Sequence, residues 1–281
     1  MPTVGARAGA CDGNQKGGFV VLPAPLLPLA TQPRESAVLV DFDGSISAIV
    51  DDPAAAHILP GARDALAGLV GVIGTVAVVS GRPVEFLARA IDLPELTLVG
   101  QYGLERMVDG RAVVDARAEP YLDAVAAAAD EIERELPDLL VERKAGVAVT
   151  VHWRKAPERE ADAITVVDRI AEHHGLAVYP TKMARELRPA VPADKGTAVE
   201  TLLDRTAHAC FAGDDRGDLD AFAALARLEK AGRLEDAVRI AVGSTEVPAE
   251  LLAQADLVVD GPVGLVSVLE ELARAATRTP R

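Results

Sequence analysis

Ala37-Val-Leu-Val-Asp-Phe-Asp-Gly-Ser45 is the stretch that decides the fold. Its first four residues form a short apolar run rich in valine, the pattern of a strand buried on both faces of a parallel sheet. Acidic residues and a glycine follow at once, as they do where such a strand opens into a loop. Because ligands bind outside the carboxyl ends of strands in open α/β sheets, Asp41 and Asp43 are candidate site residues.

Other segments repeat this pattern along the chain. Apolar runs at residues 72–79, 96–99 and 208–212 end in Ser80-Gly-Arg82, Gly100-Gln-Tyr-Gly103 and Gly213-Asp-Asp-Arg-Gly-Asp218. Helical spacing of apolar residues lies between them, and Pro83 suits the first turn of a helix. Further strands are expected at 238–242 and 257–259, with helices at 62–69, 195–204, 219–230 and from 263. The alternation predicts an α/β fold with a doubly wound parallel sheet.

The middle of the chain has a different rhythm. Helical stretches at 121–136 and 157–174 alternate with pairs of extended segments at 139–142, 147–152, 176–179 and 186–188. Such an order is typical of an α+β insert beside the main sheet. We therefore predict a loosely ordered leader at 1–34, a core at 35–116 and 190–281, and an inserted domain at 117–189.

Composition excludes several classes of protein. The chain has 281 residues and a formal net charge of −14, which is too acidic for nonspecific nucleic-acid binding. Its best apolar stretch, at residues 19–30, is interrupted by prolines and is too short to cross a bilayer. Two distant cysteines, Cys11 and Cys210, exclude a disulfide framework. A cytoplasmic protein without a membrane partner is expected, and the oligomeric state is left open, with a monomer compatible.

Acidic residues concentrate at two of the predicted strand ends. Their mutual repulsion indicates that a divalent cation lies between them, and all-oxygen ligands with few nearby histidines favour Mg²⁺ over zinc. An Asp-x-Asp pair alone is weak evidence, since a solvated turn after a strand has the same composition. The second cluster makes the metal site the better interpretation. Its candidate ligands are Asp41, Asp43, Asp214, Asp215 and Asp218.

These motifs resemble those of a known family. In order, Asp41-Phe-Asp-Gly-Ser45, Ser80, Lys195 and Gly213-Asp-Asp with Asp218 are similar to the four motifs of the haloacid dehalogenase superfamily of phosphotransferases. Finer strings resemble the trehalose-6-phosphate phosphatases within it, among them Glu142-Arg-Lys144, His152-Trp-Arg154 and Glu186-Leu-Arg-Pro189 in the insert. The resemblance covers about residues 36–270 and implies a haloacid-dehalogenase-like core with an α+β cap domain.

The resemblance implies a role for each reacting group. Asp41 would be the nucleophile that forms an aspartyl phosphate, and Asp43 would protonate the leaving sugar oxygen and then activate water. Ser80 would hydrogen-bond a phosphoryl oxygen. Lys195 would neutralise charge between the phosphate and Asp41.

The resemblance also implies binding residues. Mg²⁺ would be held by Asp41, the backbone carbonyl of Asp43 and Asp214, with Asp215 or Asp218 in support. The substrate, a small sugar phosphate, would be bound by residues of the second motif and of the cap: Gly81, Arg82, Glu142, Lys144, Glu186 and Arg188. The implied reaction is the hydrolysis of trehalose 6-phosphate to trehalose and phosphate.

Three departures from the family pattern keep alternatives open. Ser45 and Gly217 stand where threonine is usual, and Gln101 precedes Tyr102-Gly103 where many relatives carry a histidine before the glycine. The last change bears on the substrate, so a phosphatase for another sugar phosphate, such as sucrose or glucosylglycerol phosphate, remains an alternative. A noncatalytic sugar-phosphate-binding regulatory protein is an alternative from another class.

Overall fold

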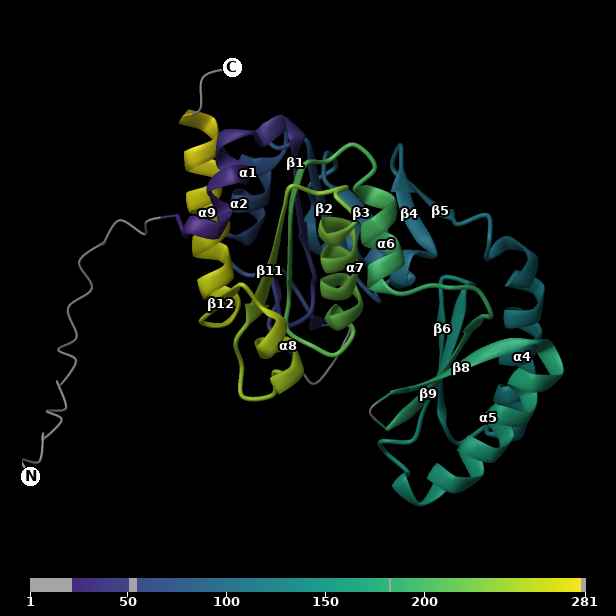
Figure 1. The fold of residues 1–281 in the computed structure, drawn as a ribbon. Helices are drawn as coiled ribbons and strands as arrows, with labels where there is room; N and C mark the ends of the chain where they lie inside the picture. Colours follow the sequence, from purple (N-terminus) through teal and green to yellow (C-terminus); the bar gives the residue numbers. More distant parts are fainter. Residues whose placement is uncertain (1–21, 51–54, 182, 279–281) are drawn as a thin grey trace, which may run out of the picture.

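The described residues form two lobes, each built on its own β-sheet (Figure 1). A computed structural model of the protein describes residues 22–50, 55–181 and 183–278. Within them, the larger lobe contains an eight-stranded sheet and the smaller lobe a four-stranded sheet. The chain enters the larger lobe first, crosses to the smaller lobe and returns.

The larger sheet has a parallel centre, which confirms the α/β class. Its strand order is β12-β11-β10-β1-β2-β3-β4-β5, and the first six strands in that order run parallel. Those strands are β1 (Ser36–Val40), β2 (Thr75–Val79), β3 (Thr97–Gly100), β10 (His208–Gly213), β11 (Asp236–Val242) and β12 (Leu257–Val259). Because β1 and β10 are neighbours in register, the loops after both strands meet at one edge of the sheet.

Helices cover both faces of this sheet, and β1 shows why both must be covered. Val38 and Val40 pack on one face and Leu39 on the other, all fully buried. The first face is covered by α1 (Leu27–Thr31), α2 (Ala62–Leu69), α3 (Val84–Ile91) and α9 (Gly261–Arg278). The second is covered by α6 (Lys195–Leu202), α7 (Asp218–Lys230) and α8 (Ala249–Gln254). Burial of one such aliphatic side chain contributes about 1.5–3 kcal/mol before entropy is subtracted.

A hairpin that the sequence interpretation missed extends the sheet beyond β3. Strands β4 (Glu105–Val108) and β5 (Arg111–Val114) pair antiparallel with each other, and β4 pairs with β3. Asp109 and Gly110 form the connection and have φ values of 49° and 74°. Two left-handed residues are what a tight two-residue hairpin requires, and Asp-Gly is its usual sequence. The Asp109-Gly110 pair is therefore the sequence feature that indicates this hairpin.

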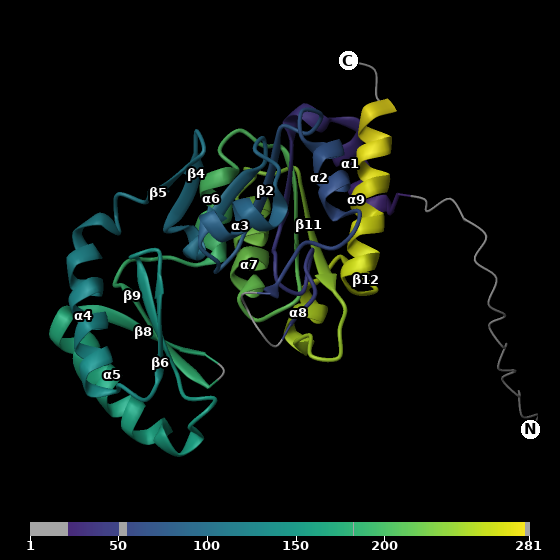
Figure 2. The ribbon, with the colours of Figure 1, turned by 180° about the vertical axis from the view of Figure 1, so that it is seen from behind.

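The smaller lobe is an antiparallel sheet with helices on one face. Its strand order is β6-β7-β9-β8. The strands are β6 (Leu140–Lys144), β7 (Ala148–His152), β8 (Leu176–Thr181) and β9 (Ala184–Pro189), and the helices are α4 (Leu122–Glu135) and α5 (Glu160–His174). Both helices lie on the outer side of the sheet, away from the larger lobe (Figure 2). The predicted α+β insert is therefore present.

The two segments that connect the lobes lie side by side. Arg117 donates a hydrogen bond of 3.1 Å to the carbonyl of Pro192 and pairs with Asp115. Ala118 and Ala193, one from each segment, pack together with Leu104. Because both crossings are tied at one place, this place is the natural hinge between the lobes.

The prediction of a loosely ordered leader was wrong from residue 22 onward. Leu26 and Leu29 are fully buried in the core of the larger lobe, and α1 packs against α9. Of the prolines that interrupt this stretch, Pro25 and Pro28 stand in the first turns of short helices, where a missing N–H costs little, and Pro23 is the N-cap of the first of these helices. Residues 1–21 lie outside the described part of the chain. Short 3₁₀ turns complete the fold: η1 (Ala24–Leu26), η2 (Pro33–Glu35), η4 (Gln101–Gly103), η5 (Glu119–Tyr121) and η6 (Pro157–Arg159).

The apolar segments of the described residues build the core. None of the helices in that part of the chain has the length and apolar character needed to span a membrane. Cys210 in β10 is 1% exposed, and burial raises the pKa of its thiol to about 12. Cys11 lies outside the described residues.

Candidate active site

Three aspartates converge at the carboxyl ends of β1 and β10. The backbone N–H of Asp41 donates to the carbonyl of Ala212 at 2.8 Å, which aligns the two loops. Oxygen atoms of Asp41, Asp214 and Asp218 all lie within 4.8 Å of one another, and all three residues are buried. The structure thus brings together groups that lie more than 170 positions apart in the chain.

Lys195 supplies the cation inside this cluster. Its Nζ lies 2.8 Å from Asp41 Oδ1 and 2.7 Å from Asp218 Oδ1, and its side chain is only 4% exposed. Burial by itself would lower the pKa of Lys195, but Asp218 and Asp41 raise it well above its usual range. Burial also raises the pKa of Asp41 well above its usual range, although Lys195 opposes the shift. One lysine does not neutralise three buried carboxylates, and the surplus negative charge suits a further cation.

Asp218 and Asp214 differ in how far their oxygens are already satisfied. Asp218 accepts hydrogen bonds from the backbone N–H groups of Asp214 and Asp215, at 2.9 and 3.0 Å, in addition to its contact with Lys195. The carboxylate of Asp214 accepts a bond of 3.4 Å from Ser45. Burial, followed by repulsion from Asp218, raises the pKa of Asp214 to about 7. Asp214 is therefore the better-placed metal ligand, and Asp218 shapes the loop.

Gly44 lets the first loop approach this cluster. Its φ is 77°, and a Cβ atom built on it would lie 2.1 Å from a carboxylate oxygen of Asp214. Any side chain at this position would displace the carboxylate, because the contact is far below van der Waals distance. The glycine of the first motif therefore serves the close approach of two acidic loops.

Asp43 lies apart from the three-aspartate cluster and is paired with Arg82. Arg82 Nε and Nη2 each donate to one oxygen of Asp43, both at 2.8 Å, in a bidentate pair. The guanidinium also lies 4.7 Å from the ring centroid of Phe86. Burial opposes the charge of Arg82, but Asp43 raises its pKa. A bidentate pair fixes the orientation of both side chains, so Arg82 positions the Asp43 carboxylate.

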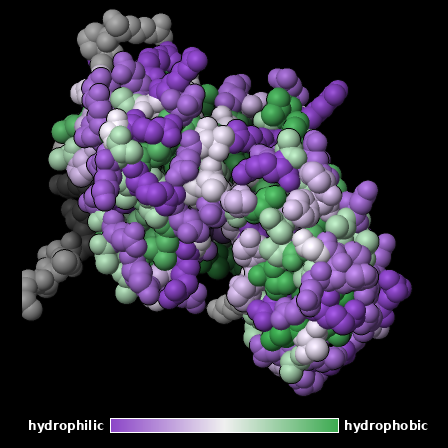
Figure 3. Space-filling model, turned by 45° about the vertical axis from the view of Figure 1, so that its right-hand side comes forward, coloured by the Kyte–Doolittle hydropathy of each residue, from purple (hydrophilic) through white to green (hydrophobic). Residues whose placement is uncertain are grey.

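A cavity of about 640 Å³ opens from these residues toward the smaller lobe. Figure 3 shows the surface hollowed between the two lobes. Residues that the sequence singled out provide most of its lining: Asp41, Asp43, Ser80, Gly81, Arg82, Glu142, Lys144, Lys195 and Asp215. The cavity therefore joins the acidic cluster of one lobe to β6 of the other.

Glu186 and Arg188, also expected to contact the sugar, lie behind the lining. Glu186 is 2% exposed, pairs with Lys144 and accepts a bond of 3.0 Å from Thr150. Arg188 lies between two tyrosine rings, 4.3 Å from the centroid of Tyr102 and 3.5 Å from that of Tyr179. In this arrangement Glu186 holds Lys144 in place, and Arg188 bridges the lobes.

Tyr102 and His152 are among the lining residues that were given no role from the sequence. Tyr102 has a φ of 58°, donates its backbone N–H to the carbonyl of Ser80, and packs so closely over Gly81 that a Cβ there would lie 2.7 Å from its ring. His152 Nε2 lies 3.1 Å from Glu142, and this bond lowers the pKa of Glu142. The polar cluster after the third predicted strand was a signal for Tyr102. The signal for His152 was its place in the string His152-Trp-Arg154, which resembles the family but was given no role.

Comparison with known proteins decides the family. The trehalose-phosphatase family model matches residues 39–257. The chain belongs to the trehalose-phosphatase family. A trehalose-phosphate phosphatase of Mycobacterium leprae is 32% identical over 265 residues, which is 88% of this chain and 60% of that protein. This member of the family therefore spans little more than half the length of that relative.

Solved structures confirm the fold of this trehalose-phosphatase family member. A trehalose-6-phosphate phosphatase related protein superposes with a TM-score of 0.71 at 22% identity, covering 86% of this chain and 99% of that one. The C-terminal domain of a trehalose synthase regulatory protein from Candida albicans gives a TM-score of 0.61 at 14% identity, covering 90% and 100%. A haloacid dehalogenase-like hydrolase from Bacteroides thetaiotaomicron gives a TM-score of 0.54 at 14% identity, covering 84% and 99%, which confirms the expected fold of the core. Such a fold carries chemistry only through its site.

Proposed function

We propose that this protein is a Mg²⁺-dependent phosphatase that hydrolyses trehalose 6-phosphate to trehalose and inorganic phosphate through an aspartyl phosphate on Asp41. The observation that carries the proposal is the contact of Asp41 with Lys195 at the floor of a cavity whose far wall comes from the other lobe. Membership of the trehalose-phosphatase family supports the substrate. The two lobes are then a core, predicted at 35–116 and 190–281 and extended by the packed residues 22–34, and a cap at 117–189.

The residues present fit a divalent cation. Asp41 and Asp214 offer buried carboxylate oxygens beside a surplus of negative charge, and oxygen-only ligands suit Mg²⁺. They would hold the ion together with the backbone carbonyl of Asp43. When bound, Mg²⁺ would orient the phosphate and offset the charge that develops on its oxygens.

The protein residues divide the proposed reaction between them. A carboxylate oxygen of Asp41 attacks phosphorus, and the bond from phosphorus to the sugar oxygen breaks while Asp43 donates a proton to that oxygen. Water then attacks the aspartyl phosphate, Asp43 accepts its proton, and Asp41 is released with inorganic phosphate. Ser80 and Lys195 donate hydrogen bonds to the phosphoryl oxygens during both steps.

Glu142 and Lys144 would select the sugar from the cap. Both line the cavity, and carboxylate and ammonium groups are suited to hydrogen bonds with sugar hydroxyls. Movement of the cap at the connecting segments would close them over the substrate and exclude bulk water. Glu186 would act through Lys144, which it contacts directly.

Phosphate release from a panel of sugar phosphates, with Mg²⁺ and with EDTA, tests this function. Trehalose 6-phosphate should have the highest kcat/KM, and EDTA should abolish its turnover. Sucrose and glucosylglycerol phosphates belong in the panel because Gln101 and Tyr102 depart from the family pattern near the cavity. A higher kcat/KM for one of those substrates would replace the proposed substrate and keep the chemistry.

A noncatalytic regulatory protein is the alternative of another class. The C-terminal domain of a trehalose synthase regulatory protein shares the fold, so the fold does not discriminate between the two. The reacting groups do, because Asp41, Asp43 and Lys195 are all present and Asp41 contacts Lys195. Binding of trehalose 6-phosphate without any phosphate release, at any Mg²⁺ concentration, would favour the regulatory alternative.

Mg²⁺ should stabilise the protein more at pH 8 than at pH 6. The folded-state pKa of Asp214 is raised to about 7 from an ordinary value of 3.8, so the metal-free fold binds this proton more tightly than the unfolded chain. The stability that the bound proton gives the metal-free fold is lost as pH rises through 7. Mg²⁺ binds the ionised carboxylate, so the stability that Mg²⁺ gives the fold grows over the same window. Thermal denaturation at both pH values measures the Mg²⁺-induced stabilisation. The Mg²⁺ concentration should rise in roughly tenfold steps from below to above the apparent Kd.

The matched control for that measurement is Asp214→Asn. It should lose most of the Mg²⁺-induced rise in melting temperature at pH 8, because one of the two buried ligand carboxylates is gone. Asp64→Asn, which changes an exposed aspartate of α2, should retain the full rise. An equal rise in both variants would place the ion elsewhere.

Arg82→Lys should slow hydrolysis of the sugar phosphate about tenfold, and Arg82→Ala about 100-fold, because Asp43 loses its bidentate partner. Lysine keeps the charge but not the planar fork. Rates on p-nitrophenyl phosphate, whose leaving group needs no proton, should fall much less. Arg89→Lys, at another arginine of the cavity, should affect both substrates equally. Equal losses for Arg82→Lys as well would show that Arg82 does not act through Asp43.

A further inference from the structure

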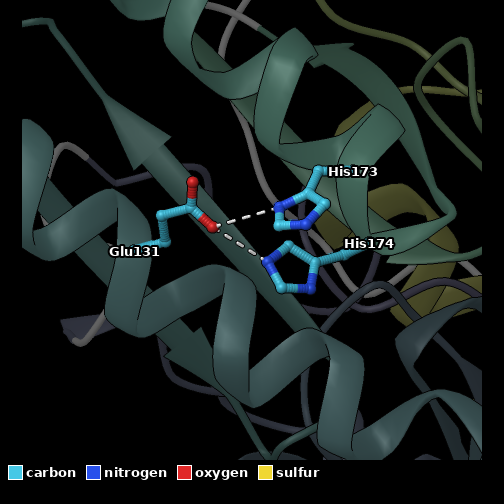
Figure 4. Close-up of side chains that lie close together, drawn as sticks. All are labelled: Glu131, His173 and His174. Carbon is cyan, nitrogen blue, oxygen red and sulfur yellow. Dashed lines mark hydrogen bonds and ion pairs between the residues drawn. The ribbon is translucent and has the colours of Figure 1, made fainter.

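A second cluster of potential metal ligands lies in the cap, on the face turned away from the cavity. It consists of Glu131 on α4 with His173 and His174 at the end of α5 (Figure 4). His174 Nε2 lies 3.0 Å and His173 Nδ1 lies 3.6 Å from the same oxygen of Glu131, Oε2. One ligand atom of each residue lies within 4.8 Å of the others. Three lone-pair donors therefore converge on one point.

The packing of the two helices fixes this convergence. Ala128 and Ile132 of α4 are buried with Val167 and Ala171 of α5 in the hydrophobic core of the smaller lobe. The last turn of α5 ends at Gly175, whose φ of 66° is the left-handed conformation that closes a helix. The positions of the three ligands are thus set by buried neighbours and a helix end rather than by a loop.

The distances suit a tetrahedral ion. Zinc lies about 2.0–2.2 Å from nitrogen and oxygen ligands, so two ligands of a tetrahedral site are roughly 3.3–3.6 Å apart. Of the two separations from Glu131 Oε2, the 3.6 Å to His173 lies at the upper end of that range and the 3.0 Å to His174 lies about 0.3 Å below it. The two imidazole nitrogens lie within 4.8 Å of each other, so side-chain rotations that shorten this separation would bring the three atoms around one centre. His173, with 68% of its side chain exposed, leaves a fourth position open to water.

Apart from the two histidines, Arg169 is the one positively charged residue in the described part of the chain that contacts Glu131. Its contact leaves the oxygen that faces the imidazoles free. It donates to the other oxygen of Glu131, Oε1, at 3.1 Å. Its charge is also matched by Glu135, at 2.6 Å. Arg169 therefore holds the carboxylate from behind, as outer-sphere partners of metal ligands do, and Oε2 stays directed at the imidazoles.

We propose that Glu131, His173 and His174 form a Zn²⁺ site that fastens α4 to the end of α5, separate from the acidic cluster of the cavity. Two imidazoles and one carboxylate match the ligand preference of zinc and its neighbours in the transition series, and not that of Mg²⁺. Neither His173 nor His174 lines the cavity. The role of the ion is structural, because it joins two helices and touches no group of the proposed reaction.

Zn²⁺ titration of tag-free protein in saturating Mg²⁺ tests the site, with calorimetry for stoichiometry and melting temperature for stability. Wild type should bind one Zn²⁺ in this background and melt several degrees higher. Co²⁺ as the probe should give the visible absorption of a four-coordinate ion. Glu131→Gln, His173→Gln and His174→Gln should each weaken Zn²⁺ binding about 100-fold or more.

Two further variants separate this site from the cavity. Asp214→Asn should lose the stabilisation by Mg²⁺ and keep that by Zn²⁺, whereas His173→Gln should do the reverse. His173 is exposed, so its replacement should leave folding intact. His57→Gln, at an exposed histidine outside the cluster, should keep both effects. Wild type that binds no Zn²⁺, or a His173→Gln protein that binds it unchanged, overturns the proposal and leaves the cluster as an ion-pair network.

Discussion

Asp41→Asn should reduce hydrolysis of trehalose 6-phosphate by at least about 10⁴-fold, because the attacking carboxylate oxygen, which is also a proposed Mg²⁺ ligand, is lost while the groups that would bind the sugar stay in place. The substitution keeps the shape of the side chain. It also removes one of three mutually repelling buried carboxylates, while Asp218 continues to pair with Lys195. The variant should therefore fold, with a melting temperature in metal-free buffer at or above that of the wild type. Phosphate release and thermal denaturation measure the two effects.

A covalent intermediate is the stricter test of the same assignment. In wild type quenched during turnover, mass spectrometry should find one phosphoryl group on the peptide that contains Asp41. With p-nitrophenyl phosphate, whose leaving group needs no proton, the Asp43→Asn variant should accumulate this species, because the base that activates water is missing. Asp41→Asn should show none. Residual activity of Asp41→Asn near the wild-type rate, or a phosphoryl group on another residue, would remove Asp41 as the nucleophile.

Local pattern was enough to predict the centre of the larger sheet. The run at 37–40 has the composition of a strand buried on both faces, and the structure places β1 between two hydrophobic clusters. The hairpin at Asp109-Gly110 shows where the pattern of apolar residues does not suffice to predict strands. Its short strands carry exposed valines, Val108 and Val113, so no clean alternation marks them, and only the turn chemistry does.

The acidic cluster could be predicted because topology alone brings its members together. Parallel neighbours end at the same edge of a sheet, so Asp41 and Asp214 had to be close once β1 and β10 were adjacent. Contacts between the lobes had no such rule behind them. The place of Arg188 between Tyr102 and Tyr179 depends on how the cap is set against the core, which no periodicity in the sequence encodes.

The pairing of Asp43 with Arg82 was hidden for a related reason. Two residues that are both singled out by motif need not be partners, and spacing along the chain does not report side-chain direction. The bend at Gly44, with a φ of 77°, turns the loop after β1. Asp41 thus joins the buried cluster, while Asp43 reaches Arg82 at the cavity. Separate surroundings for the two carboxylates suit the different roles, nucleophile and proton carrier, that we propose for them.

Lys195→Met should combine the loss of activity with a large loss of stability. Removing the shared cation leaves Asp41 and Asp218 buried without it, and breaking a buried ion pair from one side costs about 3–5 kcal/mol. Turnover should fall about 10³-fold, because a buried donor to the phosphoryl oxygens is gone. Chemical denaturation in EDTA measures the first effect and phosphate release the second. Lys230→Met, at an exposed lysine that ends α7, is the matched control and should change neither.

Two further measurements show whether Lys195→Met loses stability because the charge of Lys195 is gone or because the packing of its side chain is gone. They are the pH dependence of the stability deficit and the stability of a double variant. The pKa of Asp218 is already raised to about 6 by burial, with Lys195 opposing the shift, so removing the lysine should raise it further. A carboxyl whose folded-state pKa is raised destabilises the fold as pH rises through that window, so the deficit of Lys195→Met should be larger at pH 8 than at pH 5.5. Adding Asp218→Asn should recover part of the stability and none of the turnover, because one uncompensated charge is removed while the donor stays absent. A deficit independent of pH, unrelieved in the double variant, would mean that Lys195 stabilises the fold through the packing of its stem and not through its charge.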